Sequence, residues 1–299
     1  MKTLNILALL ACSALLWACE KEIPLDIEDA QPKIVVNSLF DTDSTWVVEV
    51  SKSRNILEED AELSLLTNAS VRLLNPDGTT EIMQHEGDGI FTSPSTPQRG
   101  NTYRLEVDAP DLESVWAENT LDNGVEVVSI DTSSTTEWDA RLYELAIRIK
   151  DVPNVRNFYN IKLRGQFWEY IWNDNTQELD SSLVYGTLFF TSEDPVLTGS
   201  ESFFDGDFFG QRGASFNDDL FEGGERTVVI EVYSWNQELI DVTVSSGSEE
   251  FYLYEVSYGL YQESRDNPFA QPVQVYTNAN NGLGIFAGVS SVTERIAVE

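Results

Sequence analysis

The sequence is poor in the residues on which most enzyme and metal sites depend. Its 299 residues include one histidine, His85, and two cysteines, Cys12 and Cys19. A histidine-based catalytic triad would have to use His85 alone, and neither a GxSxG motif nor a glycine-rich phosphate loop occurs. Zinc is disfavoured because it takes mainly histidine and cysteine ligands. We therefore interpret His85 as a surface residue, expect a non-enzymatic protein and assign no catalytic residue or zinc ligand.

Positive charge is also scarce. The chain has 18 Lys and Arg against 51 Asp and Glu, a net charge of −33 with a pI near 4.1. Nucleic acid is thereby disfavoured as a partner, because its phosphates are bound mainly by Lys and Arg. We interpret the acidity as a solubility feature, with attraction of cations or of a basic partner as the alternative. A pair of carboxylates could hydrolyse a glycoside, but among so many acids the sequence singles out no pair.

Long apolar runs are missing except at the N-terminus. Lys2 precedes a mostly apolar stretch, residues 4–17, which is too short to span a bilayer comfortably and is typical of a secretory signal. Leu16, Ala18 and Cys19 then resemble the lipobox of bacterial lipoproteins, although Trp17 is larger than the usual residue there. We predict a signal peptide at 1–18 and lipidation of Cys19.

The cysteine count supports this prediction. Cleavage before Cys19 removes Cys12, and a single remaining thiol cannot form an internal disulfide. Cleavage at Cys12 would leave too short an apolar region, and an unmodified Cys19 in an uncleaved helix is the remaining alternative. Each buried methylene of an acyl chain contributes about 0.8 kcal/mol, so two or three chains anchor a protein durably. Residues 19–30 are expected to be a tether between the lipid anchor and the body of the protein, with the membrane leaflet left open.

The rest of the chain has a β pattern and is expected to form two β-sandwich-like domains of the immunoglobulin or transthyretin type. Residues 31–119 show about seven short alternating apolar segments separated by turn residues, without a helical period. These segments are KIVVNSLF, WVVEVSKS, ASVRLL, TTEIMQH, GDGIFTS, NTYRLEVDAP and ESVWAENTL.

Residues 120–299 form the second expected domain, mainly β with one amphipathic helix near 248–263. Ser246 stands three residues before Glu249, which is the spacing of a capping box. The aromatic residues that follow recur at helical intervals and are expected to pack on a sheet; they are Phe251, Tyr254, Tyr258 and Tyr261. The expected strands are VEVVSI, YELAIRI, FYNIKLRGQFWEYIW, SLVYGTLFF, RTVVIEVYSW and VQVYT.

Residues 199–226 follow no period and combine phenylalanines, glycines and acids, which is typical of a loop that folds over something. Calcium takes oxygen ligands, and DGDFFG places a glycine at the sixth position of an EF-hand-like segment, but the remaining ligand positions do not fit. We favour ordinary solvated acids, with a calcium cage as the alternative. The candidate loop residues are Asp205, Asp207, Asp218, Asp219 and Glu222.

The stretch LRGQFWEYIWN contains the clearest candidate surface. In a strand, Trp168, Tyr170 and Trp172 point to one face, opposite the face that begins with core residues such as Ile161. The three rings would then be exposed and could bind a glycan or a protein partner. A bulge at Gly165 would instead send them into the core.

Several blocks of the sequence resemble a known family. They are ASVRLLNPDG, GDGIFTS, RGNTYRLEV, FNDDLFEGGERTVVIEV and, as the most specific, NPFAQPVQVYTNANNGLGIFAG. Together they are similar to a family of Bacteroidota-type lipoproteins catalogued as domain of unknown function 4249. The resemblance implies a lipidated N-terminus, a β-rich body and genes near those of TonB-dependent outer-membrane receptors. It implies no catalytic residue. The expected function is that of an accessory or ligand-capturing partner of such a receptor, with a glycan-binding lipoprotein as the alternative.

Overall fold

Strands dominate the part of the chain that the structure describes, at 59% of its residues against 8% in helices, which confirms the mainly β prediction. The computed structural model describes residues 31–54, 64–122, 124–137, 140–173, 176–198, 212–234, 239–265 and 270–297. The predicted signal peptide, Cys19 and the tether lie outside the described residues, as do Asp205 and Asp207. No helix among the described residues is long and apolar enough to cross a membrane.

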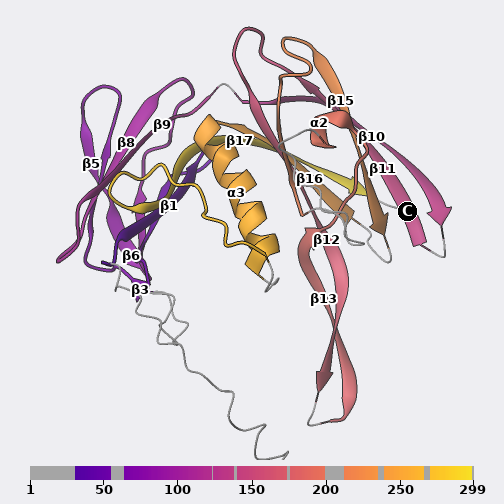
Figure 1. Cartoon of the computed structure of the whole chain (residues 1–299), viewed down its shortest axis with the longest axis horizontal. Coiled ribbons are helices and arrows are strands. Elements are labelled where there is room, and N and C mark those ends of the chain that lie inside the picture. The colour runs from indigo at the N-terminus through magenta and orange to yellow at the C-terminus, as the bar shows by residue number, and fades with distance from the viewer. Residues whose placement is uncertain are drawn as a thin grey trace, which may run out of the picture. The chain divides into compact units, whose positions relative to one another are not determined.

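The strands follow the alternation expected from the sequence over most of the chain (Figure 1). In the first part they are β1 (Ile34–Phe40), β2 (Trp46–Lys52), β3 (Ser64–Leu65), β4 (Ser70–Leu74), β5 (Thr80–Ile82), β6 (Gln84–Gly87), β7 (Ile90–Ser93), β8 (Thr102–Asp108) and β9 (Val115–Thr120). Thereafter come β10 (Glu126–Glu137), β11 (Ala140–Lys150), β12 (Phe158–Asn173), β13 (Glu178–Leu188), the short helix α2 (Pro195–Thr198), β14 (Ala214–Asn217), β15 (Glu225–Ser234), β16 (Leu239–Gly247), the helix α3 (Glu249–Arg265) and β17 (Leu283–Ala297).

The described strands form three sheets. The largest runs in the order β13-β12-β16-β17-β1-β2-β7-β6, with β14 paired to β12 and β3 paired to β2. β10-β11-β15 make a three-stranded sheet, and β5-β4-β8-β9 make a four-stranded one. β17 connects the two halves of the largest sheet, because it pairs in parallel with β1 and antiparallel with β16.

Two hydrophobic cores lie between these sheets, which makes the architecture sandwich-like. One core joins β1, β2 and β7 to β4, β8 and β9, and its fully buried side chains include Trp46, Leu73 and Leu105. The other joins β12 and β16 to β11 and β15 through residues such as Ile161 and Leu145. The first core also contains Phe286 from β17. The domain boundary at 119/120 stays a prediction.

The order of the last strands differs from the sequence-based expectation. VQVYT, residues 273–277, is not a strand, whereas β14, β16 and β17 are strands that the pattern did not indicate. The segment around VQVYT is held by side chains instead: the Tyr276 N–H donates to Ser257 Oγ at 2.8 Å, and Asn278 exchanges two hydrogen bonds with the backbone of Phe286. β-Propensity alone does not reveal which segments find a neighbouring strand.

α3 confirms the predicted helix but begins with a different cap. Ser248, not Ser246, accepts the Phe251 N–H on its hydroxyl, at 3.3 Å. Only the N-terminal half packs as expected: Phe251 is buried and Tyr254 packs against the same cluster, whereas Tyr258 and Tyr261 are exposed. The prediction that the whole aromatic stripe packs on a sheet was therefore wrong for its C-terminal half. The tyrosines stack on one another along the helix, with ring centroids 5.8 Å apart for Tyr254 and Tyr258.

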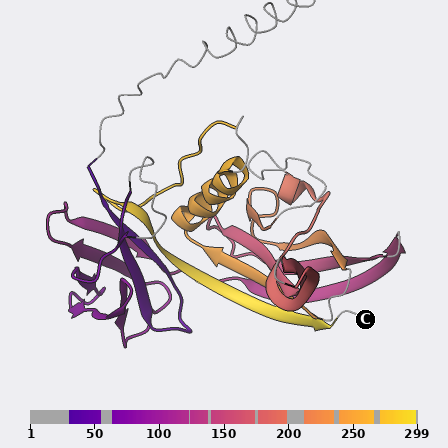
Figure 2. The ribbon, with the colours of Figure 1, turned by 90° about the horizontal axis from the view of Figure 1, so that it is seen from below.

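α3 covers the face of β12 that is turned away from the core. Figure 2 shows the helix lying over the strands of the large sheet. The Phe158 and Tyr252 ring centroids are 5.0 Å apart, and Lys162 Nζ lies 2.7 Å from Glu255 Oε2 on the helix. Phe158 and Lys162 are both even-numbered. Since side chains alternate along a strand, the even-numbered residues of β12 share the side of α3.

Candidate partner-binding hairpin

β12 and β13 form a long hairpin whose outer part stands apart from the rest of the sheet (Figure 1). Their register pairs Leu163 with Leu188 and continues without a shift to Asn173 and Glu178. β16 pairs with β12 only as far as Gly165. Among the described residues, the part of β12 beyond Gly165 therefore has β13 as its sole strand partner.

One face of this outer hairpin is apolar. Trp168 and Trp172 lie opposite Leu183 and Leu179, respectively. Tyr170 and Tyr185 share the same parity and complete the set. We call these side chains the apolar hairpin face: Trp168, Tyr170, Trp172, Leu179, Leu183 and Tyr185. Their exposed fractions range from 41% for Tyr185 to 59% for Tyr170. The aromatic stripe predicted from the sequence is thus exposed and lies on the side of α3.

Gly165 does not form the bulge considered as an alternative. It pairs with Gly186 on one side and Ile240 on the other, in an unbroken register. Its lack of a side chain serves close packing, since a Cβ there would lie 2.7 Å from Leu188 Cδ1 and 3.0 Å from the Leu239 carbonyl oxygen. The parity of β12 consequently continues through Gly165, and the rings stay outside the core.

The opposite face of the outer hairpin is mostly polar. Glu169 pairs with Ser182, and Ile171 pairs with Asp180. Ile171 is exposed at 57%, and Phe167 pairs with Val184 nearer the base of the hairpin. Two-stranded hairpins are marginally stable in water by themselves, and contiguous exposed apolar surfaces usually mark interaction sites. The apolar hairpin face is such a surface, whereas the face behind it mixes polar and apolar residues.

A charged network fixes the base of the hairpin. Asp241 of β16 lies in one row with Arg164 of β12 and Arg295 of β17. Arg295 donates two hydrogen bonds to the buried Asp241 carboxylate, at 2.6 and 2.8 Å, and the Tyr185 hydroxyl donates a third. The Arg164 guanidinium stacks over the Tyr185 ring, 4.7 Å from its centroid. Tyr185 therefore links the apolar hairpin face to the body of the sheet.

This network also sets the protonation of its members. Hydrogen bonds from Arg295 and then from Tyr185 lower the pKa of Asp241 to about 2. The hydrogen bond to Asp241, followed by burial, raises the pKa of Tyr185 above its ordinary value. The Asp241 carboxylate is consequently charged and the Tyr185 hydroxyl protonated at neutral pH, which is the state that the hydrogen bonds require.

Two of the described candidate acids of the 199–226 loop, Asp218 and Asp219, have structural partners. Asp218 is buried and accepts the Asn157 N–H at 2.9 Å. Asp219 lies 3.2 Å from Arg156 in an exposed ion pair, and Glu222 is exposed on the turn that follows. Within the described residues, no three or more His, Cys, Asp or Glu side chains cluster as metal ligands. A calcium site that includes Asp205 and Asp207 stays a prediction.

His85 is exposed on β6, with its ring 5.0 Å from that of Phe91. The sequence placed it on the approach to a loop, and it lies on a strand instead. His85 pairs with Phe91 in the sheet, and after a shift in register Gly87 pairs with Ile90.

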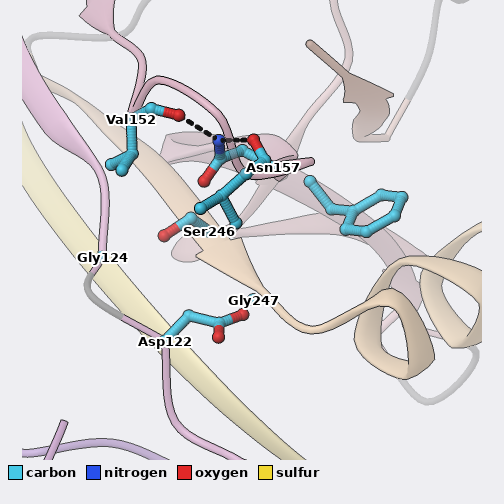
Figure 3. Close-up of a pocket in the computed structure, with 8 residues that line it drawn as sticks. Asp122, Gly124, Val152, Asn157, Ser246 and Gly247 are labelled. Atoms are coloured by element: carbon cyan, nitrogen blue, oxygen red, sulfur yellow. Dashed lines mark hydrogen bonds between the residues drawn. The ribbon is translucent and has the colours of Figure 1, made fainter. Parts of the chain in front are cut away.

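A small pocket lies between β12, β16 and the segment after β9 (Figure 3). It encloses about 40 Å³ and is lined by Asp122, Gly124, Val152, Val155, Asn157, Phe158, Ser246 and Gly247. The Ser246 hydroxyl is buried and has no hydrogen-bond partner among the residues that the structure describes. Burial, with the nearby Glu250 charge, raises the pKa of Asp122. This volume suits a few water molecules, because ligand pockets usually measure about 300–1,000 Å³.

Half of the apolar hairpin face was missed by sequence reasoning. Leu179, Leu183 and Tyr185 alternate along β13, and this period was the available signal. The expected strand began at Ser182, so Leu179 was left outside it. The contact of Tyr185 with Asp241 joins residues 56 positions apart and has no local signal.

The fold and the hairpin define a class: mainly β, sandwich-like proteins with an exposed apolar hairpin. More particularly, the chain belongs to the family described as Domain of unknown function (DUF4249), whose model matches residues 20–295. This match confirms the family resemblance of the sequence blocks.

Other comparisons add little. No curated protein matches the chain. Among solved structures, it is similar to the crystal structure of a DUF4785 family protein from Legionella pneumophila, at 10% identity. The similarity covers 71% of this chain and 50% of that one, so the chain spans about half the length of its match. The TM-score is 0.21, which carries no inference about fold or function.

Proposed function

We propose that this protein is a non-enzymatic, lipid-anchored outer-membrane protein that binds a TonB-dependent receptor through its apolar hairpin face. The observation that carries the proposal is the exposure of six large apolar side chains on one face of a two-stranded hairpin. Trp and Tyr are enriched among the residues that contribute most to protein interfaces. The class of partner comes from the family resemblance, and the anchor comes from the signal-like N-terminus and Cys19.

The composition of the face favours a protein over a membrane. The hairpin residues nearest the turn are polar or acidic, including Asn173 and Glu178, and they would enter a bilayer before the rings. A partner that approaches the face from the side meets mainly apolar side chains, with Ser181 opposite Tyr170 and Gln166 opposite Tyr185 as polar members. The geometry is therefore suited to lateral docking.

A glycan-binding lipoprotein that acts without a receptor is the second candidate. The row of Trp168, Tyr170 and Trp172 favours it, because sugar rings stack on such faces. Leu179 and Leu183 on the neighbouring strand weigh against it, since they offer apolar bulk without hydrogen bonds to hydroxyls. A glycan array with wild type and Trp168→Ala tests this candidate; indifference to the substitution removes it.

Recovery of partners from a native membrane extract tests the main proposal. The full lipidated protein is expected to retain an outer-membrane barrel, and the double variant Trp168→Ala/Trp172→Ala is expected to lose most of it. Ile171→Ala is the matched control, because it removes a similarly exposed apolar side chain from the opposite face. If no barrel is recovered under conditions that preserve known complexes, the proposal is wrong.

Mass spectrometry of the mature protein tests the anchor separately. We expect an N-terminal Cys19 that carries acyl chains. An intact leader peptide or an unmodified Cys19 thiol would contradict the anchored state, whatever the extract experiment gives.

A further inference from the structure

The outer edge of β13 is unpaired. β13 is the last strand in the order of the largest sheet, and it pairs with β12 along one edge only. β14, which also pairs with β12, ends its pairing at Ile161, short of the hairpin. Among the described residues, no strand pairs with the other edge of β13. Its N–H and C=O groups on that side are therefore open to another strand.

This edge lacks most of the features that usually block strand addition. Proteins protect exposed edges with charged side chains, above all Lys, or with prolines, bulges or short strands, and the charged residues of β13 are the acids Glu178 and Asp180 alone. β13 is 11 residues long, contains neither Lys nor Pro, and pairs with β12 without a shift in register. Its apolar residues Leu179 and Leu183 project from one face of the strand, where they would adjoin the side chains that an added strand places on the same face.

Charge determines which strand would fit. From Gly165 to Leu188 the sequence has no Lys or Arg, whereas it has Glu169, Asp174, Glu178 and Asp180. A second copy of the hairpin would bring like charges together, which disfavours self-association through this edge. A segment with Lys or Arg at alternate positions would instead meet these acids on the polar face.

We infer that β13 accepts an extended, basic segment of a partner protein as an additional β-strand. Alternate apolar side chains of that segment would extend the apolar hairpin face, and its basic side chains would lie beside Glu178 and Asp180. Backbone hydrogen bonds provide the affinity in this mode, and alternate side chains provide the specificity. The inference rests on the proposed function for the partner's identity, but it concerns how the partner is held.

The full protein in detergent is first tested with defined peptides. A ten-residue peptide that alternates Lys and Val is the probe, and a Glu–Val peptide of the same length is the control. We expect the Lys–Val peptide to bind at least ten-fold more tightly at low salt. We also expect it to slow amide hydrogen exchange at every second residue of β13. Binding without slower exchange on β13, or with slower exchange on β12 beyond Gly165 instead, would overturn the inference.

Two neighbouring proline substitutions then distinguish binding at the outer edge of β13 from binding at the apolar hairpin face. Successive N–H groups of a strand point to opposite edges, so one of Ser181→Pro and Ser182→Pro removes an outward N–H and the other an inward one. Exchange along β12 identifies the inward variant, because only that variant disrupts the β12–β13 ladder. The outward variant is expected to keep the hairpin and to lose peptide binding by at least ten-fold. Unchanged peptide binding by this variant would contradict strand addition.

The same variants in the membrane-extract experiment distinguish the two proposals. If the Trp168→Ala/Trp172→Ala variant loses the receptor and the outward proline variant retains it, the receptor binds the apolar hairpin face without strand addition. The inference is then wrong and the proposed function stands. If the wild-type protein retains no receptor, the proposed function is wrong, and the peptide experiment alone tests the inference.

Discussion

Arg295 holds the Asp241 carboxylate through two hydrogen bonds, from Nε at 2.6 Å and from Nη2 at 2.8 Å. The pair joins β17 to β16 beside the base of the hairpin, where the Tyr185 hydroxyl donates to the same carboxylate. Asp241 is buried, so its charge depends on these donors. The Asp241 carboxylate thus binds Tyr185 of the apolar hairpin face and Arg295 of β17 at the same time, and it orients the face relative to the sheet.

Acid should weaken this connection over a defined range. The pKa of Asp241 is about 2 in the folded protein against an ordinary value of 3.8. Because the folded pKa is the lower one, the stabilisation is complete above the ordinary value and is lost as pH falls towards 2. We expect the free energy of unfolding, from denaturant titrations, to fall between pH 4 and 2. Asp241→Asn should be less stable at neutral pH and should lack this part of the pH dependence; an identical pH profile would contradict the assignment.

A buried amide joins the start of α3 to β9 and β17. Asn119 donates to Ser248 Oγ at 3.0 Å and to Glu250 Oε2 at 2.8 Å, and its Oδ1 accepts the Gly288 N–H at 2.9 Å. Asn119→Ala leaves the buried Gly288 N–H without this acceptor, and we expect a loss of about 1–3 kcal/mol in the free energy of unfolding.

Ser248→Ala is the companion variant for Asn119. It removes the cap of α3 and should cost about 1 kcal/mol. Denaturant titrations of Asn119→Ala and Ser248→Ala measure the two losses in the free energy of unfolding. If Asn119→Ala were as stable as wild type, the amide would not be a structural link.

Gly284 allows β17 to lie against β1. Its φ is +100°, and a Cβ there would lie 1.9 Å from the Val36 carbonyl oxygen, across the pair that the two residues form. Gly284→Ala should therefore prevent the parallel pairing, with a large fall in melting temperature or loss of folded protein. Gly87→Ala is the control, since Gly87 has a φ of +119° and open space around it.

Strain alone should cost Gly87→Ala about 1–3 kcal/mol. The collision with Val36 comes in addition at Gly284. Equal effects of the two substitutions, measured by thermal unfolding, would show that the close approach of the strands does not matter.

The local pattern predicted most of what is local. Alternation identified β1, β2 and β8, and the helical period identified α3. The sequence predicts the cap at Ser246, two residues early, because Ser246 and Ser248 both precede acidic residues. The start of the helix depends on tertiary packing, since Gly247 lies close to Phe251 and Gly288 and leaves Ser248 to cap the helix. β17 was not predicted because its serines and glycines match no period. Consecutive residues of its N-terminal half are buried, so the strand is covered on both faces there and shows no alternation.

The candidate site could be predicted only in part, because some of its features depend on residues that are distant in the sequence. Parity along one strand put Trp168, Tyr170 and Trp172 together, but their exposure depends on where β16 stops pairing, at Gly165. That end is set by a strand more than 70 residues away in the sequence. The local sequence does not indicate where β16 stops pairing with β12. The pattern of β12 therefore could not show whether the three rings lie in the core or on the surface.

Site-specific photo-crosslinking in living cells tests the central claim most directly. A photoreactive amino acid replaces Trp168 or Trp172 on the apolar hairpin face, and Ile171 on the opposite face serves as the control. The proposed function predicts that both positions on the apolar face cross-link to an outer-membrane barrel protein, and that position 171 gives at least ten-fold less product. Equal cross-linking from the two faces, or none from the apolar face while the protein is correctly anchored, would contradict it.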